Sequence, residues 1–97
     1  MRFETKIPKT NIINLLRAGG YHFQKEEENE MSFYHLLGSL RYPRFHIYLM
    51  KKKEVFVFNL HLDQKKPSYK GSPAHSAEYE GNLLEEEKER IKKLLGL

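Results

Sequence analysis

Two histidines and a neighbouring arginine are the residues of this chain best suited to acid–base chemistry. His46 and His61 lie in two stretches of alternating polar and apolar residues, 44–50 and 55–63, and Arg44 opens the first stretch. Histidine titrates near neutral pH, so it can remove a proton from a 2′-hydroxyl or protonate a leaving oxygen. A nearby cation stabilises the negative charge that develops on phosphorus. The sequence therefore makes His46 and His61 candidate catalytic residues for metal-independent RNA cleavage.

Two other interpretations of these histidines stay open. His61 and Asp63 are two residues apart, so they project from the same face of a strand, and His75 follows in the next segment. Imidazole and carboxylate groups together can bind zinc or manganese. Both histidines also fit ordinary strand positions that make surface hydrogen bonds. Because the chain has no Gly-rich nucleotide cradle and no nucleophile elbow, no cofactor is predicted.

The alternation over residues 44–63 predicts an antiparallel hairpin with one buried face. Large apolar side chains occupy every second position and should face the core: Phe45, Ile47, Leu49, Phe56, Phe58, Leu60 and Leu62. A turn centred on Lys52 and Lys53 gives these cross-strand pairs: Arg44 with His61, His46 with Asn59, and Tyr48 with Val57. The outer face would then carry one polar patch, with Tyr48 at its edge: Arg44, His46, Asn59 and His61.

The segments before this hairpin predict one helix and two extended stretches. Residues 8–18 have Pro8 in the first turn, an apolar stripe, and a Gly-Gly stop, as expected for a helix. An extended segment starts at residues 21–24, and the charged residues 25–30 should form an exposed turn. A further strand is expected over residues 32–37, although its inward and outward faces cannot be assigned from the pattern.

The C-terminal third predicts a long polar loop followed by a helix. Residues 64–81 are rich in polar residues, Gly and Pro, and a loop of this length is usually functional or disordered. Asn82 and Glu85 are spaced as in a capping box, and acidic residues follow where the helix dipole favours them. We therefore expect the closing helix to begin at Asn82 and to end at Gly96.

Positive charge is concentrated in the middle of the chain. The net charge is +4, but residues 41–70 alone carry eight Lys and Arg residues against Glu54 and Asp63. Such a region attracts polyanions, of which nucleic acid is the commonest. Within the polar loop, four side chains suit phosphate contact and base stacking: Lys65, Lys66, Tyr69 and Lys70. A surface loop with no ligand fits the same composition.

Length and composition restrict the class of protein. The 97 residues allow one domain, 1–97, with the 64–81 loop inside it. The absence of cysteine excludes disulfides, thiolate zinc sites and cysteine nucleophiles. No apolar run approaches the roughly 20 residues that span a bilayer. The expectation is an α+β protein of the cytoplasm that does not enter a membrane.

Three stretches resemble the HicA (YcfA-like) toxins, which are small ribonucleases neutralised by an antitoxin protein. They are the helix end and turn at residues 15–21, the pair of strands with His46-Ile47-Tyr48 and residues 57–61, and the Gly81-Asn82-Leu83 start of the closing helix. The resemblance implies a double-stranded-RNA-binding-domain (dsRBD) fold. That fold is an α-β-β-β-α two-layer sandwich with an antiparallel sheet of three or four strands and both helices on one face. Phe45 stands where the family has its first histidine of a His-His pair, so His46 matches the second.

The leading hypothesis is an RNA-binding protein that contacts RNA through Arg44, Tyr48, Asn59 and the basic loop. The resemblance adds ribonuclease activity through His46 or His61, and an antitoxin-type protein partner. The alternative is a protein-interaction module without catalysis, in which the 64–81 loop becomes ordered against a partner.

Overall fold

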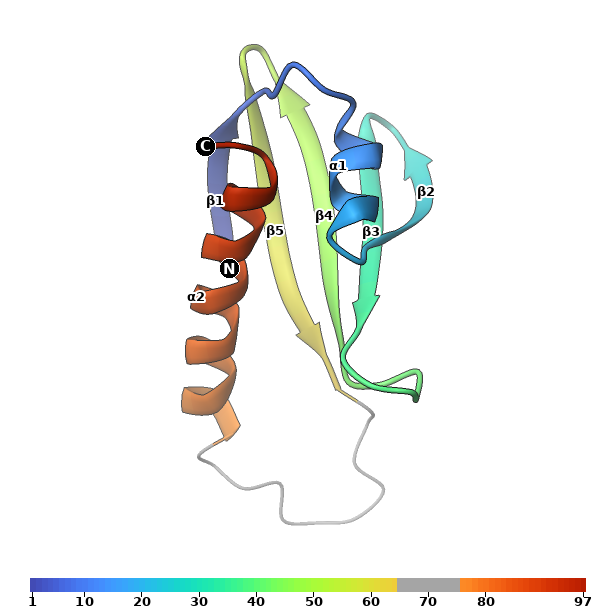
Figure 1. Ribbon diagram of the computed structural model, residues 1–97, viewed down its shortest axis with the longest axis vertical. Coiled ribbons are helices and arrows are strands. Elements are labelled where there is room, and N and C mark those ends of the chain that lie inside the picture. The colour runs from blue at the N-terminus through green and yellow to red at the C-terminus, as the bar shows by residue number, and fades with distance from the viewer. Residues whose placement is uncertain (65–75) are drawn as a thin grey trace.

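A computed structural model describes residues 1–64 and 76–97 as a five-stranded antiparallel sheet with two helices against one face (Figure 1). The elements follow in the order β1 (Arg2–Lys6), α1 (Ile12–Ala18), β2 (His22–Glu27), β3 (Glu30–Leu36), β4 (Arg44–Lys52), β5 (Val55–Asp63) and α2 (Ser76–Leu94). Across the sheet the strand order is β1-β5-β4-β3-β2. The α+β class is confirmed, but the sheet has five strands where three or four were expected.

β1, which was not predicted, and β2, which extends the segment predicted to start at residues 21–24, lie at the two edges of the sheet. β1 pairs with β5, and within it the Phe3 ring stacks on Phe58 at a centroid distance of 4.9 Å. β2 pairs with β3, and all six of its residues are exposed. The prediction of an exposed turn over residues 25–30 is therefore wrong. The turn is confined to Glu28 and Asn29, which both have positive φ, as a two-residue hairpin connection requires.

The structure confirms which side chains of the central hairpin face the core, but the predicted cross-strand register is wrong. Arg44 lies opposite Asp63, His46 opposite His61, and Tyr48 opposite Asn59. The two-residue connection is Lys53-Glu54, because Lys52 pairs with Val55 and Lys53 takes a positive φ of 50°. The predicted pairing was therefore shifted by two residues. A shift by an even number leaves every side chain on its predicted face.

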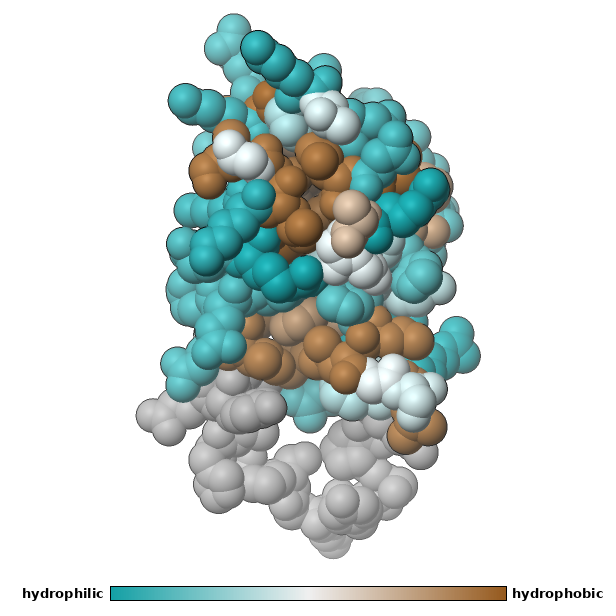
Figure 2. All heavy atoms as spheres, viewed as in Figure 1, coloured by the Kyte–Doolittle hydropathy of each residue, from teal (hydrophilic) through white to brown (hydrophobic). Residues whose placement is uncertain are grey.

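The hydrophobic core fills the space between the sheet and the helices. Its fully buried members from the strands are Phe33, Ile47, Leu49, Phe58 and Leu60, and they pack with Tyr21, Leu16 of α1 and Ile91 of α2. Hydrophobic atoms remain visible between the two helices on this side of the molecule (Figure 2). The opposite face of the sheet carries no helix (Figure 1).

Both helices begin at positions other than those predicted. α1 starts at Ile12 because the Asn11 side chain caps it, accepting hydrogen bonds from the backbone N–H groups of Ile13 and Asn14 at 2.8 and 3.2 Å. α2 starts at Ser76, so Asn82 lies inside the helix and the predicted capping box is wrong. Residues 76–81 of the predicted 64–81 loop are thus helical. Residues 65–75 lie outside the described part of the chain.

A glycine is required where α1 turns into β2. Gly20 has a φ of +97°, and a Cβ there would lie 2.9 Å from Nε2 of His35. We expect Gly20→Ala to lower the free energy of unfolding by about 2 kcal/mol, from backbone strain and displacement of the imidazole. Urea denaturation measures this, with Gly38→Ala as the matched control, because nothing lies within 4 Å of a Cβ at Gly38. Equal stability of the two variants would contradict the prediction.

Candidate nucleic-acid interface

The outer face of the sheet brings together the residues predicted to form a polar patch. Cross-strand pairing places Arg44, His46 and Tyr48 of β4 beside Asn59 and His61 of β5. These side chains alternate with the buried ones, so they lie on the side away from both helices. The corrected register sets the two histidines directly opposite each other, closer than predicted.

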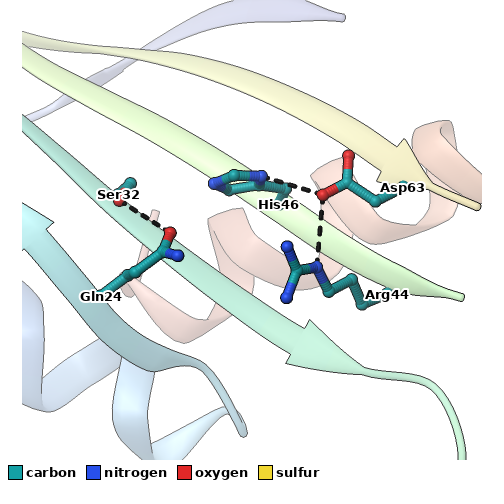
Figure 3. A network of polar contacts seen from close by, with 5 residues as sticks. All are labelled: Gln24, Ser32, Arg44, His46 and Asp63. Atoms are coloured by element: carbon teal, nitrogen blue, oxygen red, sulfur yellow. Dashed lines mark hydrogen bonds and ion pairs between the residues drawn. The ribbon is translucent and has the colours of Figure 1, made fainter. Parts of the chain in front are cut away.

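Asp63, at the end of β5, holds two of these side chains. Its Oδ2 atom lies 3.0 Å from Nδ1 of His46 and 3.3 Å from Nε of Arg44 (Figure 3). A carboxylate only accepts hydrogen bonds, so Nδ1 of His46 donates to Asp63. Asp63 therefore fixes both the orientation of the imidazole and the position of the guanidinium.

His46 is on the predicted face but is not accessible. The residue is only 8% exposed, and the Tyr48 ring lies against its imidazole at a centroid distance of 4.5 Å. Its Nε2 atom is buried and has no hydrogen-bond partner among the residues that the structure describes. His46 thus does not meet the requirement that a catalytic group can touch its substrate, and it is better suited to supporting its neighbours.

His61 is the accessible member of the pair. It is exposed, and its ring makes an edge contact with Tyr48 at a centroid distance of 5.9 Å. Partial burial lowers the pKa of His61 below its ordinary value of 6.5, and the positive N-terminus adds to this, while Asp63 opposes it. His61 is therefore neutral at pH 7, which is the form that accepts a proton.

Arg44 lies between two tyrosine rings that the sequence analysis did not select. Its guanidinium carbon is 5.3 Å from the centroid of Tyr34 on β3 and 4.9 Å from that of Tyr42 in the 37–43 loop. Both distances are within the range of a cation–π interaction. The sequence signal was Arg41-Tyr42-Pro43-Arg44, in which a tyrosine lies between two arginines, but Arg44 alone of these four residues was predicted to contact RNA.

A depression of about 480 Å³ opens beside Arg44 on this part of the surface. It is lined by Phe23, Gln24, Tyr34, Leu36, Arg41 and Arg44. Gln24 is oriented by Ser32, whose hydroxyl donates to the amide oxygen of Gln24 at 3.1 Å (Figure 3). The depression thus combines two guanidinium groups and an amide with apolar and aromatic walls.

The predicted metal site finds no support in this geometry. Asp63 already binds His46 and Arg44, and a guanidinium beside a carboxylate opposes the binding of a cation. In residues 1–64 and 76–97, no three His, Asp or Glu side chains come together in a way that could hold a metal ion. His75 lies outside the described residues, as do four predicted RNA contacts: Lys65, Lys66, Tyr69 and Lys70.

A second polar cluster lies on the inner side of the sheet, and the sequence analysis missed it. Glu87 of α2 is 5% exposed and accepts hydrogen bonds from the Tyr21 hydroxyl at 2.6 Å and from Arg90, through Nε and Nη2, at 2.7 Å each. Nη2 of Arg90 also lies 3.2 Å from Nδ1 of His35, which must accept because the guanidinium only donates. This network joins α2 to the sheet.

Burial and neighbouring charges shift the pKa values of the residues in the inner cluster. Burial, with Glu87 next in effect, raises the pKa of the Tyr21 hydroxyl. The hydrogen bonds to Glu87 raise the pKa of Arg90, whereas burial and the Arg90 charge lower that of His35. The cluster therefore keeps a neutral phenol, a neutral imidazole and an ion pair at neutral pH, which suits a structural role.

These features define an α+β protein with one helix-covered and one bare face of a five-stranded antiparallel sheet. In the described residues, neither helix is long and apolar enough to cross a membrane. Comparison of the chain with models of known families, with curated proteins and with solved structures finds no match.

Proposed function

We propose that this protein binds single-stranded RNA on the bare face of its sheet. The observation that carries the proposal is the concentration of aromatic, imidazole and guanidinium groups on that face, around Arg44 and its two tyrosines. Unpaired bases stack on aromatic and guanidinium planes, and cations contact the phosphates. A sheet presenting such groups is one common way for proteins to hold single-stranded RNA.

We also propose that the fold is a variant of the dsRBD-like arrangement. From α1 to α2 the chain runs helix, strands, helix, and the strands β2 to β5 form a meander with both helices on one side. β1 is then an additional strand at the β5 edge. The resemblance to HicA-like toxins, with its antitoxin-type partner, stays a prediction from sequence.

RNA cleavage is a second candidate function, and the position of His61 favours it. A neutral His61 would take the proton of a 2′-hydroxyl, whose oxygen attacks the adjacent phosphorus. The bond to the 5′-oxygen breaks, and water protonates this oxygen, leaving a 2′,3′-cyclic phosphate and a free 5′-hydroxyl. Arg44 is a diagonal cross-strand neighbour of His61, at roughly 7–8 Å between such positions, and would offset the charge on the phosphate.

Binding of a labelled single-stranded oligouridine across a salt series tests the main proposal. The logarithm of the association constant should fall linearly with that of salt concentration, with a slope of about −0.7 for each phosphate contacted. Asn59→Glu, which adds a negative charge to the bare face, should weaken binding about fivefold at low salt.

The matched control is Asn14→Glu, the same change at an exposed position of α1 on the opposite side of the molecule. This variant should bind like the unaltered protein. Affinity that is independent of salt, or that falls equally in both variants, would contradict RNA binding at the bare face.

A further inference from the structure

The depression beside Arg44 presents hydrogen-bond donors almost exclusively. Arg41 and Arg44 contain only donors, the amide nitrogen of Gln24 adds another, and the amide oxygen of Gln24 accepts a hydrogen bond from Ser32. In Figure 3 the Gln24 amide and the Arg44 guanidinium face each other. A complementary ligand must therefore offer acceptors, and the walls formed by Phe23 and Leu36 favour a flat, apolar body.

Arg44 is held in a fixed orientation. Its side chain is only 12% exposed, its Nε donates to Asp63, and its guanidinium carbon lies 5.3 and 4.9 Å from the ring centroids of Tyr34 and Tyr42. Arg44 lines the depression, and within residues 1–64 and 76–97 its two terminal nitrogens have no hydrogen-bond partner, so they can act as two parallel donors. Because Asp63 holds Nε, the edge of Arg44 that carries the terminal nitrogens is suited to binding a pair of adjacent acceptors. Arg41, which is exposed, is free for a phosphate.

Among the nucleobases, guanine matches this arrangement. Its O6 and N7 atoms are two adjacent acceptors that a guanidinium binds in a bidentate manner. Adenine presents one donor and one acceptor on the same edge, and cytosine presents an amino donor. We infer that the depression is a guanine subsite of the RNA-binding face; this inference rests on the proposed function and adds a base preference to it.

Nine-residue oligouridines that carry a single central G, A or C test the preference, alongside the all-uridine oligomer. The G-containing RNA should bind the protein about tenfold more tightly than the A-containing RNA. In Arg44→Lys, a point charge replaces the bidentate edge, so the ratio of the affinities for the G-containing and A-containing RNAs should fall from about tenfold to about twofold, whatever the change in overall affinity.

Arg17→Lys, at an exposed position of α1, is the matched control and should keep the full preference. Circular dichroism establishes whether each variant is folded. If Arg44→Lys is unfolded, Gln24→Leu takes its place as the test variant. This change on the exposed edge strand β2 removes one donor and should also reduce the preference for the G-containing RNA.

The outcomes distinguish the guanine preference from RNA binding itself. Salt-dependent binding of all four RNAs with equal affinity would overturn the guanine subsite and leave RNA binding intact. Failure of all four to bind would overturn both. If the guanine preference persists in folded Arg44→Lys, the subsite does not lie in this depression. If Arg44→Lys is unfolded, the same conclusion follows from a preference that persists in Gln24→Leu.

Discussion

Replacing Glu87 with alanine is expected to lower the free energy of unfolding by about 3 kcal/mol, because the buried Tyr21 hydroxyl loses its acceptor and two charge-assisted hydrogen bonds are lost. The two hydrogen bonds come from Arg90, which is partly exposed, and all three groups lie at the contact between α2 and the sheet. For a domain of this size the melting temperature should fall by about 15 °C. Urea and thermal denaturation followed by circular dichroism measure both quantities.

Glu89→Ala is the control, since Glu89 lies on the same helix, is exposed, and has only a 4.0 Å contact with Lys92. It should change the stability by less than about 0.5 kcal/mol. The double variant Glu87→Leu with Arg90→Met should recover part of the loss, because it removes both charges together. If Glu87→Ala is no less stable than Glu89→Ala, the inner cluster does not hold α2 to the sheet.

If the protein cleaves RNA, His61→Ala should reduce the cleavage rate at least about a hundredfold, the usual contribution of a general base. His22→Ala is the matched control: His22 is an exposed histidine on β2, beside Tyr34, and its strand lies two strands from β4 and three from β5. It should keep nearly full activity. Cleavage of a fluorogenic RNA, with detection of the cyclic phosphate product, provides the measurement.

The pH profile gives an independent test of the same residue. A general base acts when deprotonated, so the rate should rise with pH and become constant above the pKa of His61. Because burial lowers this pKa, the midpoint should lie below 6.5, the ordinary value for histidine. A midpoint above 6.5, or a rate that His61→Ala leaves unchanged, would exclude His61 as the base.

The faces of the central hairpin were predictable and its pairing was not. Alternation with a period of two assigns each side chain of β4 and β5 to one face, because only one face can enter the core. The pairing depends on which two residues form the turn, and Lys52-Lys53-Glu54 contains no Asn-Gly or Asp-Gly signal to place it. The prediction therefore gave the correct patch with incorrect partners.

Edge strands and tertiary contacts account for most of what the sequence did not reveal. β1 and β2 pair on one side only and bury few side chains, so their sequences lack a strong apolar pattern. Glu87 is the buried one of three consecutive glutamates in α2, because Tyr21 and Arg90 lie where they can donate hydrogen bonds to it. Likewise, Tyr42 reaches Arg44 through the path of a loop, which no periodicity encodes.

The separation of the two sides of the sheet has a consequence for how this protein can change. Residues that hold the molecule together and residues available to a ligand alternate along the same strands, yet they belong to opposite surfaces. Accessible positions such as His61 and Asn59 can be exchanged without altering the hydrophobic interior. The scaffold is thus suited to acquiring new specificities, in nature or in the laboratory, through a handful of substitutions that leave its architecture untouched.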